Sequence, residues 1–254
     1  MCGVPPESLE PYIDVSPVRE GATAHVARGG ELLERGRPKD ALESFERAVA
    51  LDNASAAAHM GCGHAQAALG RPGRALASFR CAAMAGAGSA AHVCCGIVLL
   101  ESGRAAEALE SFGRALESGG GADAHLGRSR ALLELGRHAE ALGAADLALA
   151  ASPADASAHI ARGHALRGLG DHEGALASCE EAVAAGPTVA YAHACRAVAL
   201  LAFGRPDRAL EAADRAVSLD AGLGAAHAAR AEALAVLGRG EEADAERAMA
   251  GRAV

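Results

Sequence analysis

Residues 159–182 read HIARGHALRGLGDHEGALASCEEA, and residues 193–216 read HACRAVALLAFGRPDRALEAADRA. Each stretch begins with His, has Gly eleven residues later, and has Ala sixteen and twenty-three residues after the His. The same four columns occur seven times along the chain, at steps of 33 or 34 residues. A constant internal period of this length is typical of a repeat architecture in which each unit is one supersecondary structure.

We number positions within a unit from the column histidine, so that the glycine is at position +11 and the alanines are at +16 and +23. The columns comprise His25, His59, His92, His125, His159, His193 and His227; Gly36, Gly70, Gly103, Gly136, Gly170, Gly204 and Gly238; Ala41, Ala75, Ala108, Ala141, Ala175, Ala209 and Ala243; and Ala48, Ala82, Ala115, Ala148, Ala182, Ala216 and Ala250. Seven matches in every column exclude chance, even in a chain with 68 alanines.

Each unit predicts two helices joined by a tight turn. Glycine at +11 suits the left-handed position that ends a helix. In three units the glycine is followed by Arg-Pro, and proline is well placed in the first turn of a second helix because its missing N–H has no partner there. Small residues at +4, +16 and +23 allow the helices to approach closely, and leucines fill the remaining space. We therefore expect Ala175 to lie at a helix crossing and Ala177 to lie outside it.

These columns resemble the tetratricopeptide repeat (TPR) family, whose pattern has small residues and alanines at the matching positions. Phenylalanine occurs at the family position in the first three units only, as Phe45, Phe79 and Phe112, and His replaces the family's Trp. The resemblance implies an all-α, right-handed superhelical α-solenoid of seven stacked helix-turn-helix units, with a concave groove lined by the first helices. The units are expected at 22–55, 56–88, 89–121, 122–155, 156–189, 190–223 and 224–254, after a mobile, Pro-rich N-terminal arm at 1–21.

The composition of the chain makes some functions and cellular compartments less suitable than others. The net charge of −8 argues against binding a phosphate backbone as the main activity. Seven cysteines, an odd number, do not indicate a disulfide framework, so a reducing cytoplasm is the expected compartment. The N-terminus shows no signal peptide, and we expect no apolar stretch long enough to span a membrane.

Asp244 and Arg247 give the last helix a polar face, so we expect it to close the stack and the chain to be complete.

The histidines and cysteines that could bind a metal or act in catalysis are explained more simply as structural residues. The column histidines are interpreted as partly buried packing residues, because neighbouring first helices lie about 10 Å apart and metal ligands must lie within about 2.3 Å of the ion. A zinc set of His59, Cys62, His92 and Cys95 is a minor alternative that the same separation argues against. No phosphate-binding loop is visible, and the repeats leave no room for a catalytic domain. We therefore expect no enzyme activity, no metal and no cofactor.

The groove positions differ along the chain. In the first three units they include an apolar strip with Val26, Met60, Val93 and Ile97, together with Leu33 and Leu100. In the fourth to sixth units they include the polar residues Arg130, His164, Arg167 and Tyr191, with Asp123 and Glu134 beside them. In an alternative interpretation, part of this apolar strip is buried as core between neighbouring units. The Lys and Asn clamp with which some TPR domains hold chaperone tails is absent, because Lys39 and Asn53 lie outside the first helices.

Two further patterns give structural hypotheses. Arg at position +3 occurs wherever position +21 of the same unit is acidic, which suggests the pairs Arg28–Glu46, Arg128–Asp146, Arg162–Glu180 and Arg196–Asp214. The two 33-residue units end in glycine-rich turns near 86–88 and 119–121. We expect these two joins to be the softest, with 119–121 dividing three N-terminal units from four C-terminal ones.

The sequence thus predicts a cytoplasmic, non-enzymatic scaffold that binds a peptide segment or helix of another protein in its groove, without nucleic acid or membrane. Two alternatives stay open: an RNA-binding helical repeat protein, and a regulatory repeat subunit of a separate enzyme such as a glycosyltransferase. The identity of the partner and the oligomeric state are not visible in the sequence.

Overall fold

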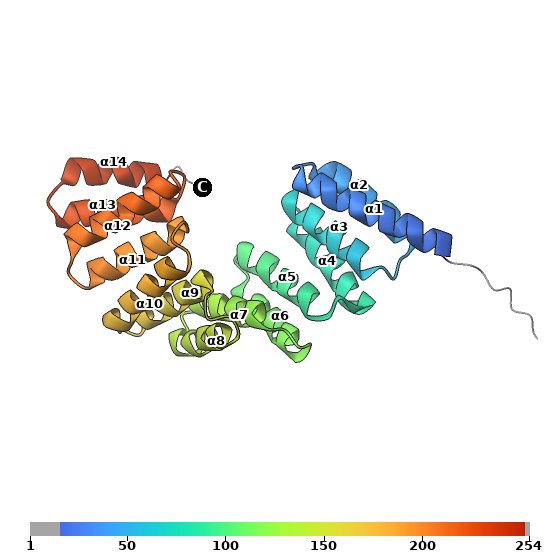
Figure 1. The fold of residues 1–254 in the computed structure, drawn as a ribbon, viewed down its shortest axis with the longest axis horizontal. Helices are drawn as coiled ribbons and strands as arrows, with labels where there is room; N and C mark the ends of the chain where they lie inside the picture. Colours follow the sequence, from blue (N-terminus) through green and yellow to red (C-terminus); the bar gives the residue numbers. More distant parts are fainter. Residues whose placement is uncertain (1–15, 252–254) are drawn as a thin grey trace, which may run out of the picture. The chain divides into compact units, whose positions relative to one another are not determined.

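The computed structural model describes residues 16–251 and places fourteen α-helices and no strand in them (Figure 1). The helices are α1 Ser16–Glu34, α2 Pro38–Leu51, α3 Ala56–Ala68, α4 Pro72–Ala82, α5 Gly88–Glu101, α6 Ala105–Glu117, α7 Ala122–Glu134, α8 His138–Ala151, α9 Ala156–Gly168, α10 His172–Ala185, α11 Ala190–Ala202, α12 Pro206–Leu219, α13 Gly224–Val236 and α14 Gly240–Ala250. A π-helical segment, η1, spans Ala83–Ala87. The fold is an α-solenoid of adjacent helix pairs, one pair in each predicted repeat.

The N-terminal boundary differs from the expected one. Helix α1 begins at Ser16, so residues 16–21, which the repeat pattern assigns to a mobile arm, belong to the first helix. The rest of the predicted arm, residues 1–15, lies outside the described residues.

The chain divides into two compact units, Met1–Ala87 and Gly88–Val254, which are described separately below. This boundary coincides with the first of the two glycine-rich joins, where Gly86 has φ +100° and Gly88 has φ +53°. The expected division at 119–121 is therefore wrong, because helices α6 and α7 on either side of that join pack together in the second unit. The softness of both joins stays a prediction.

Glycine ends the first helix of every pair. All seven glycines at position +11 have φ between +67° and +82°, the left-handed region that glycine occupies without strain. Three residues after the end of α1, for example, the N–H of Arg37 donates to the carbonyl of Leu32 over 2.8 Å, and Pro38 then starts α2. The predicted turn, with glycine at its left-handed position and proline at the next helix start, is confirmed.

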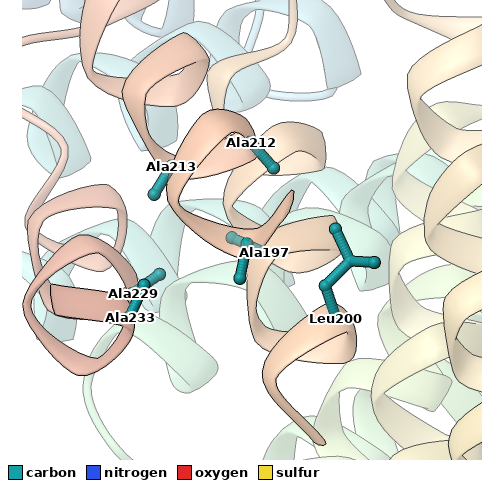
Figure 2. Close-up of a cluster of buried hydrophobic side chains, with 7 residues drawn as sticks. Ala197, Leu200, Ala212, Ala213, Ala229 and Ala233 are labelled. Carbon is teal, nitrogen blue, oxygen red and sulfur yellow. The ribbon is translucent and has the colours of Figure 1, made fainter. Parts of the chain in front are cut away.

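The small-residue columns form the core. Every alanine at +16 and +23 is at most 1% exposed, apart from the half-buried Ala250 near the chain end. Figure 2 shows part of this core in α11, α12 and α13, where Leu200 lies at one edge of a group of buried alanines, namely Ala197, Ala212, Ala213, Ala229 and Ala233. Ala175 is 1% exposed and Ala177 is exposed, so the predicted helix faces are confirmed.

Phenylalanines at +20 are accommodated by glycines on two helices. A Cβ atom on Gly29 or Gly61 would overlap the ring of Phe45, and a Cβ atom on Gly96 or Gly127 would overlap the ring of Phe112. The glycines occupy position +4 of the same repeat and position +2 of the next one. Phe79 has a glycine on one side only, Gly63 at +4, because position +2 of the next repeat is Cys94. A large side chain at +20 is therefore matched by glycine at +4 in all three repeats and by glycine at +2 of the next repeat in two of them.

Smaller residues replace this set in later repeats. In the fifth repeat, position +20 is Cys179, and its partner at +2 of the next repeat is Cys195. These two cysteines, on α10 and α11, form a disulfide with a Cα–Cα distance of 5.9 Å. The cysteine count did not suggest this bond, because both residues also fit as small core residues in columns that vary between Phe, Ala and Gly.

The column histidines have a hydrogen-bonding role. In four repeats Nε2 lies 2.9–3.0 Å from the carbonyl oxygen of the residue six positions earlier, in the turn that leads into the helix. The pairs are His59–Asn53, His159–Pro153, His193–Pro187 and His227–Ala221. His92 and His125 follow the two shortened turns and show no such bond within the described residues. The histidine is thus a packing residue that also fixes the turn between repeats, where the turn has its full length.

Two of the arginines at +3, Arg162 and Arg230, contact an acid of the preceding repeat. Nε of Arg162 lies 2.8 Å from Oδ1 of Asp146, and Nε of Arg230 lies 2.8 Å from Oδ1 of Asp214. Each acid belongs to the second helix of the preceding repeat, which packs against the first helix that carries the arginine. The hypothesis of intra-repeat pairs is therefore wrong, since none of Arg28–Glu46, Arg128–Asp146, Arg162–Glu180 and Arg196–Asp214 forms an ion pair in the described structure.

One helical stretch must be compared with the expectation that no part of the chain is long and apolar enough to span a membrane. Residues 72–101 are long and apolar enough to cross a membrane by length and composition alone, contrary to the expectation that no stretch of the chain is. Gly86 interrupts the helical backbone of this run, and Phe79 and Leu99 within it are buried in the protein. Core helices of proteins that do not span a membrane share this length and composition, so these two properties alone do not make residues 72–101 a membrane segment.

Replacing Ala175 with Leu will destabilise the second unit by about 1–3 kcal/mol, because the added atoms must enter a packed helix crossing. The matched change Ala177→Leu, two residues away on the exposed face, will cost much less. Chemical denaturation of both variants measures the difference. Equal losses of stability would show that the crossing tolerates a larger side chain and that the alanine column is not a packing constraint.

The last repeat will lose stability as the pH rises through the raised pKa of His227. Its Nδ1 lies 2.6 Å from Oε2 of Glu246 and its Nε2 lies 3.0 Å from the carbonyl of Ala221, so the protonated ring donates twice. The hydrogen bond to Glu246, then that to Ala221, raise the pKa above its ordinary value, against burial and the nearby Arg230. The stabilisation is present below the unfolded pKa and disappears above the folded one.

Thermal unfolding across this pH range measures the effect. The variant His227→Gln will flatten the decline in unfolding temperature, whereas His172→Gln, at an exposed position on α10, will leave it unchanged. A decline of the same size in both variants would assign the pH dependence to other groups.

Candidate functional site

Helices α7, α8, α9 and α11 of the second unit surround a concave pocket of about 680 Å³, which we call the α7–α11 pocket. The repeat geometry places first helices side by side, so that positions +1, +5 and +8 of successive repeats face the same hollow. Leu126, Leu133 and Ile160 supply its apolar lining, and Ile160 is buried in the core between α9 and α11. The site is therefore a polar-edged hollow with an apolar base, the form expected for a binding site.

A histidine and a tyrosine meet across two repeats in this pocket. The Tyr191 hydroxyl lies 3.3 Å from Nε2 of His164, and the two rings are 6.0 Å apart at their centroids. Burial and the adjacent charge of Arg167 lower the pKa of His164, so its imidazole is neutral at pH 7. A neutral Nε2 without a proton can accept a hydrogen bond from the Tyr191 hydroxyl, which holds the Tyr191 side chain while the residue is 43% exposed.

Glycine at position 168 makes room for a second histidine. The ring of His138, at the start of α8, lies where a Cβ atom of Gly168 on α9 would be. Nδ1 of His138 is buried and has no hydrogen-bond partner in the described structure. His138 therefore forms one wall of the pocket, with its Nδ1 packed against the Gly168 backbone.

Two exposed arginines give the pocket a positive edge. Arg130 on α7 and Arg167 near the end of α9 line it, together with one acid, Glu134. None of these three side chains forms an ion pair among residues 20–251. The two guanidinium groups can thus donate to a ligand without first breaking a bond within the protein.

The structure brings together half of the groove residues expected from the sequence. Arg130, His164, Arg167 and Tyr191 line the α7–α11 pocket. Val93 and the 39% exposed Ile97 lie on α5 of the same unit but do not line it.

The other expected groove residues, Val26 and Met60, are half-buried in the first unit. Val26 and Leu33 pack against the core around Phe45. Leu100 in the second unit is 6% exposed. Part of the apolar strip is therefore core, as the alternative interpretation had it.

Sequence reasoning missed His138 because it lies on a second helix, outside the positions expected to face the groove. The signal that could have found it is Gly168, a glycine near the end of a helix where the other repeats have larger residues or alanine. In the described residues, no group of three or more His, Cys, Asp or Glu side chains is placed to hold a metal ion.

Comparison with known proteins identifies the class of protein that this fold and pocket define. Tetratricopeptide repeat models match residues 32–92 and, in three overlapping segments, 96–156, 148–190 and 160–223. The chain therefore belongs to the tetratricopeptide repeat family. No curated protein sequence matches it.

Solved structures share the fold at low sequence identity. A tetratricopeptide repeat protein from Parabacteroides merdae aligns with a TM-score of 0.75 at 16% identity, over 92% of this chain and 93% of that one. The APC/C hetero-tetramer Cut9-Hcn1 aligns with a TM-score of 0.73 at 18% identity, over 85% of this chain and 43% of that chain. YrrB, described as a TPR protein with an unusual peptide-binding site, aligns with a TM-score of 0.54 at 22% identity, over 73% of this chain and 96% of that one.

Proposed function

We propose that the protein is a non-enzymatic scaffold that binds a peptide segment of a partner protein in the α7–α11 pocket. Tetratricopeptide repeats generally mediate protein–protein interaction, which makes another protein the favoured ligand class. The observation that carries the proposal is the pairing of an apolar base with two arginines that have no ion-pair partner in the described structure. A segment with an acidic side chain beside an apolar one complements this surface.

The groups in the pocket are suited to binding rather than to reaction. His164 is engaged by the Tyr191 hydroxyl, and the arginine side chains offer only hydrogen-bond donors. These groups hold and orient a ligand through hydrogen bonds and charge. No cofactor or metal enters the proposal.

Peptides selected from a random displayed library against the full-length protein will carry Asp or Glu, and they provide the probe. Replacing both Arg130 and Arg167 with Ala will weaken their binding about ten-fold or more, because hydrogen bonds to charged groups are lost. Fluorescence anisotropy measures the affinities. Arg114→Ala, an exposed arginine on α6 that does not line the pocket, is the matched control and will bind as the wild type does.

Unchanged affinity in the double arginine variant would contradict the assignment of this pocket. Binding of single-stranded RNA that weakens steeply with salt, in the absence of peptide binding, would favour the RNA-binding alternative instead. Catalytic activity that appears only in a purified complex would favour the regulatory-subunit alternative.

We also propose a reducing cytoplasm as the compartment, since four of the six described cysteines are thiols. The disulfide between Cys179 and Cys195 opposes this proposal, because structural disulfides belong mainly to oxidising compartments. Thiol trapping in intact cells, followed by mass spectrometry, tests it: alkylation of both Cys179 and Cys195 supports a reducing compartment, and a fully oxidised pair contradicts it.

A further inference from the structure

An arginine connects three consecutive helices in the middle of the second unit. Arg162 on α9 contacts Asp146 on α8 through Nε, and one of its terminal nitrogens donates to the Ser178 hydroxyl on α10 over 2.8 Å. Ser178 in turn donates to the backbone carbonyl of Gly174 over 2.9 Å, so its oxygen is acceptor for the guanidinium. The guanidinium thus occupies a site formed by an acid at +21 of one repeat and a hydroxyl at +19 of the next.

The last repeat contains the same arrangement. Arg230 on α13 forms an ion pair with Asp214 on α12, with Nε 2.8 Å from Oδ1, although Nε is not aligned for a hydrogen bond as it is in Arg162. A terminal nitrogen of Arg230 donates to Glu246 on α14 over 3.2 Å. Positions +3, +21 and +19 are the same three as around Arg162. Two independent repeats therefore place a guanidinium between an acid and a second acceptor.

The first unit has hydrogen-bond acceptors at the same two positions, +21 and +19, but no arginine at +3 between them. Helix α3 lies between α2 and α4, with Glu46 at +21 of the preceding repeat and Ser78 at +19 of its own. Position +3 is Cys62, whose side chain ends well short of the reach of an arginine. A pocket of about 290 Å³ lies here, lined by Glu46, Cys62, Ser78, Gln66, His59 and Cys81, and we call it the Cys62 pocket.

The chemistry of this pocket fits a cation. The Ser78 hydroxyl donates to Oε1 of Gln66 over 2.8 Å, which leaves its oxygen lone pairs to accept a hydrogen bond. Glu46 is exposed and forms no ion pair in the part of the chain that the structure describes. Cys62, 5% exposed, forms the floor, and burial followed by the Glu46 charge raises the pKa of its thiol to about 11. The floor is therefore neutral, and the carboxylate supplies a net negative charge.

We propose that the Cys62 pocket receives the side chain of an arginine from a partner protein, in the position that Arg162 and Arg230 fill from within the chain. The planar fork of a guanidinium can reach a carboxylate and a hydroxyl on different helices at once, which a lysine ammonium does less well. The pocket lies on α2, α3 and α4 of the first unit, so it is separate from the α7–α11 pocket.

The test is an NMR titration of the full-length protein with N-acetyl-arginine amide as the probe. We expect saturable shifts of backbone amides around Glu46, Cys62 and Ser78. N-acetyl-citrulline amide, which has the same shape without the charge, will give no localised shifts. N-acetyl-lysine amide will bind more weakly than the arginine probe, and equal or tighter binding of lysine would overturn the assignment of an arginine site.

Three variants distinguish this site from general charge effects. Glu46→Gln will weaken probe binding about five-fold, while the matched control Glu43→Gln, an exposed acid on the same helix, will not change it. Cys62→Arg will fill the pocket from within, abolish the probe shifts and raise the unfolding temperature. If this variant fails to fold, Ser78→Ala tests the same acceptor set and will also weaken binding.

Absence of localised shifts with the arginine probe, or shifts that persist unchanged in Glu46→Gln, would overturn the proposal. Either result would leave the proposed function of the α7–α11 pocket intact, because the Arg130 and Arg167 variants do not touch the first unit. Conversely, loss of acidic-peptide binding in those variants says nothing against the Cys62 pocket. The two proposals therefore fail separately.

Discussion

The stack depends on close approach between helix backbones, and small side chains at fixed positions make that approach possible. Alanine at +16 and +23 is buried almost completely in nearly every repeat. With so few aromatic residues, 2% of the chain, burial is achieved by bringing backbones together rather than by large side chains between them. Where Phe45 and Phe112 do occur, glycines on two neighbouring helices provide the space. Size matching between neighbouring positions is thus the central constraint of the fold.

That constraint determines where the molecule can vary. Position +3 of the first helix lies outside the small columns, and in different repeats it holds an arginine that connects three helices or a cysteine that leaves a pocket. Positions +5 and +8 are also free to vary, and they carry His164, Arg130 and Arg167 in the α7–α11 pocket. Polar function is therefore placed on a scaffold whose packing is determined by other positions.

The sequence predicted the helix pairs, their turns and the buried alanines because these are local and repeat seven times. It did not predict which acid each arginine meets, since an acid at +21 is compatible with an arginine in its own repeat or in the next. Only the packing of α8 on α9 decides in favour of Arg162–Asp146. His138 was missed because it reaches the pocket from a second helix. The disulfide was missed because Cys179 and Cys195 are also the right size for core positions.

A double-mutant cycle on Phe112 and Gly127 tests size matching most directly, with unfolding free energies of the wild type, both single variants and the double variant. Gly127→Ala places a Cβ atom in the Phe112 ring, and Phe112→Ala empties the space between α6 and α7. If the two positions are matched in size, the double variant will be more stable than the sum of the single losses implies, by about 1 kcal/mol or more. Additive losses, within about 0.5 kcal/mol, would contradict it, because the two positions would then be independent.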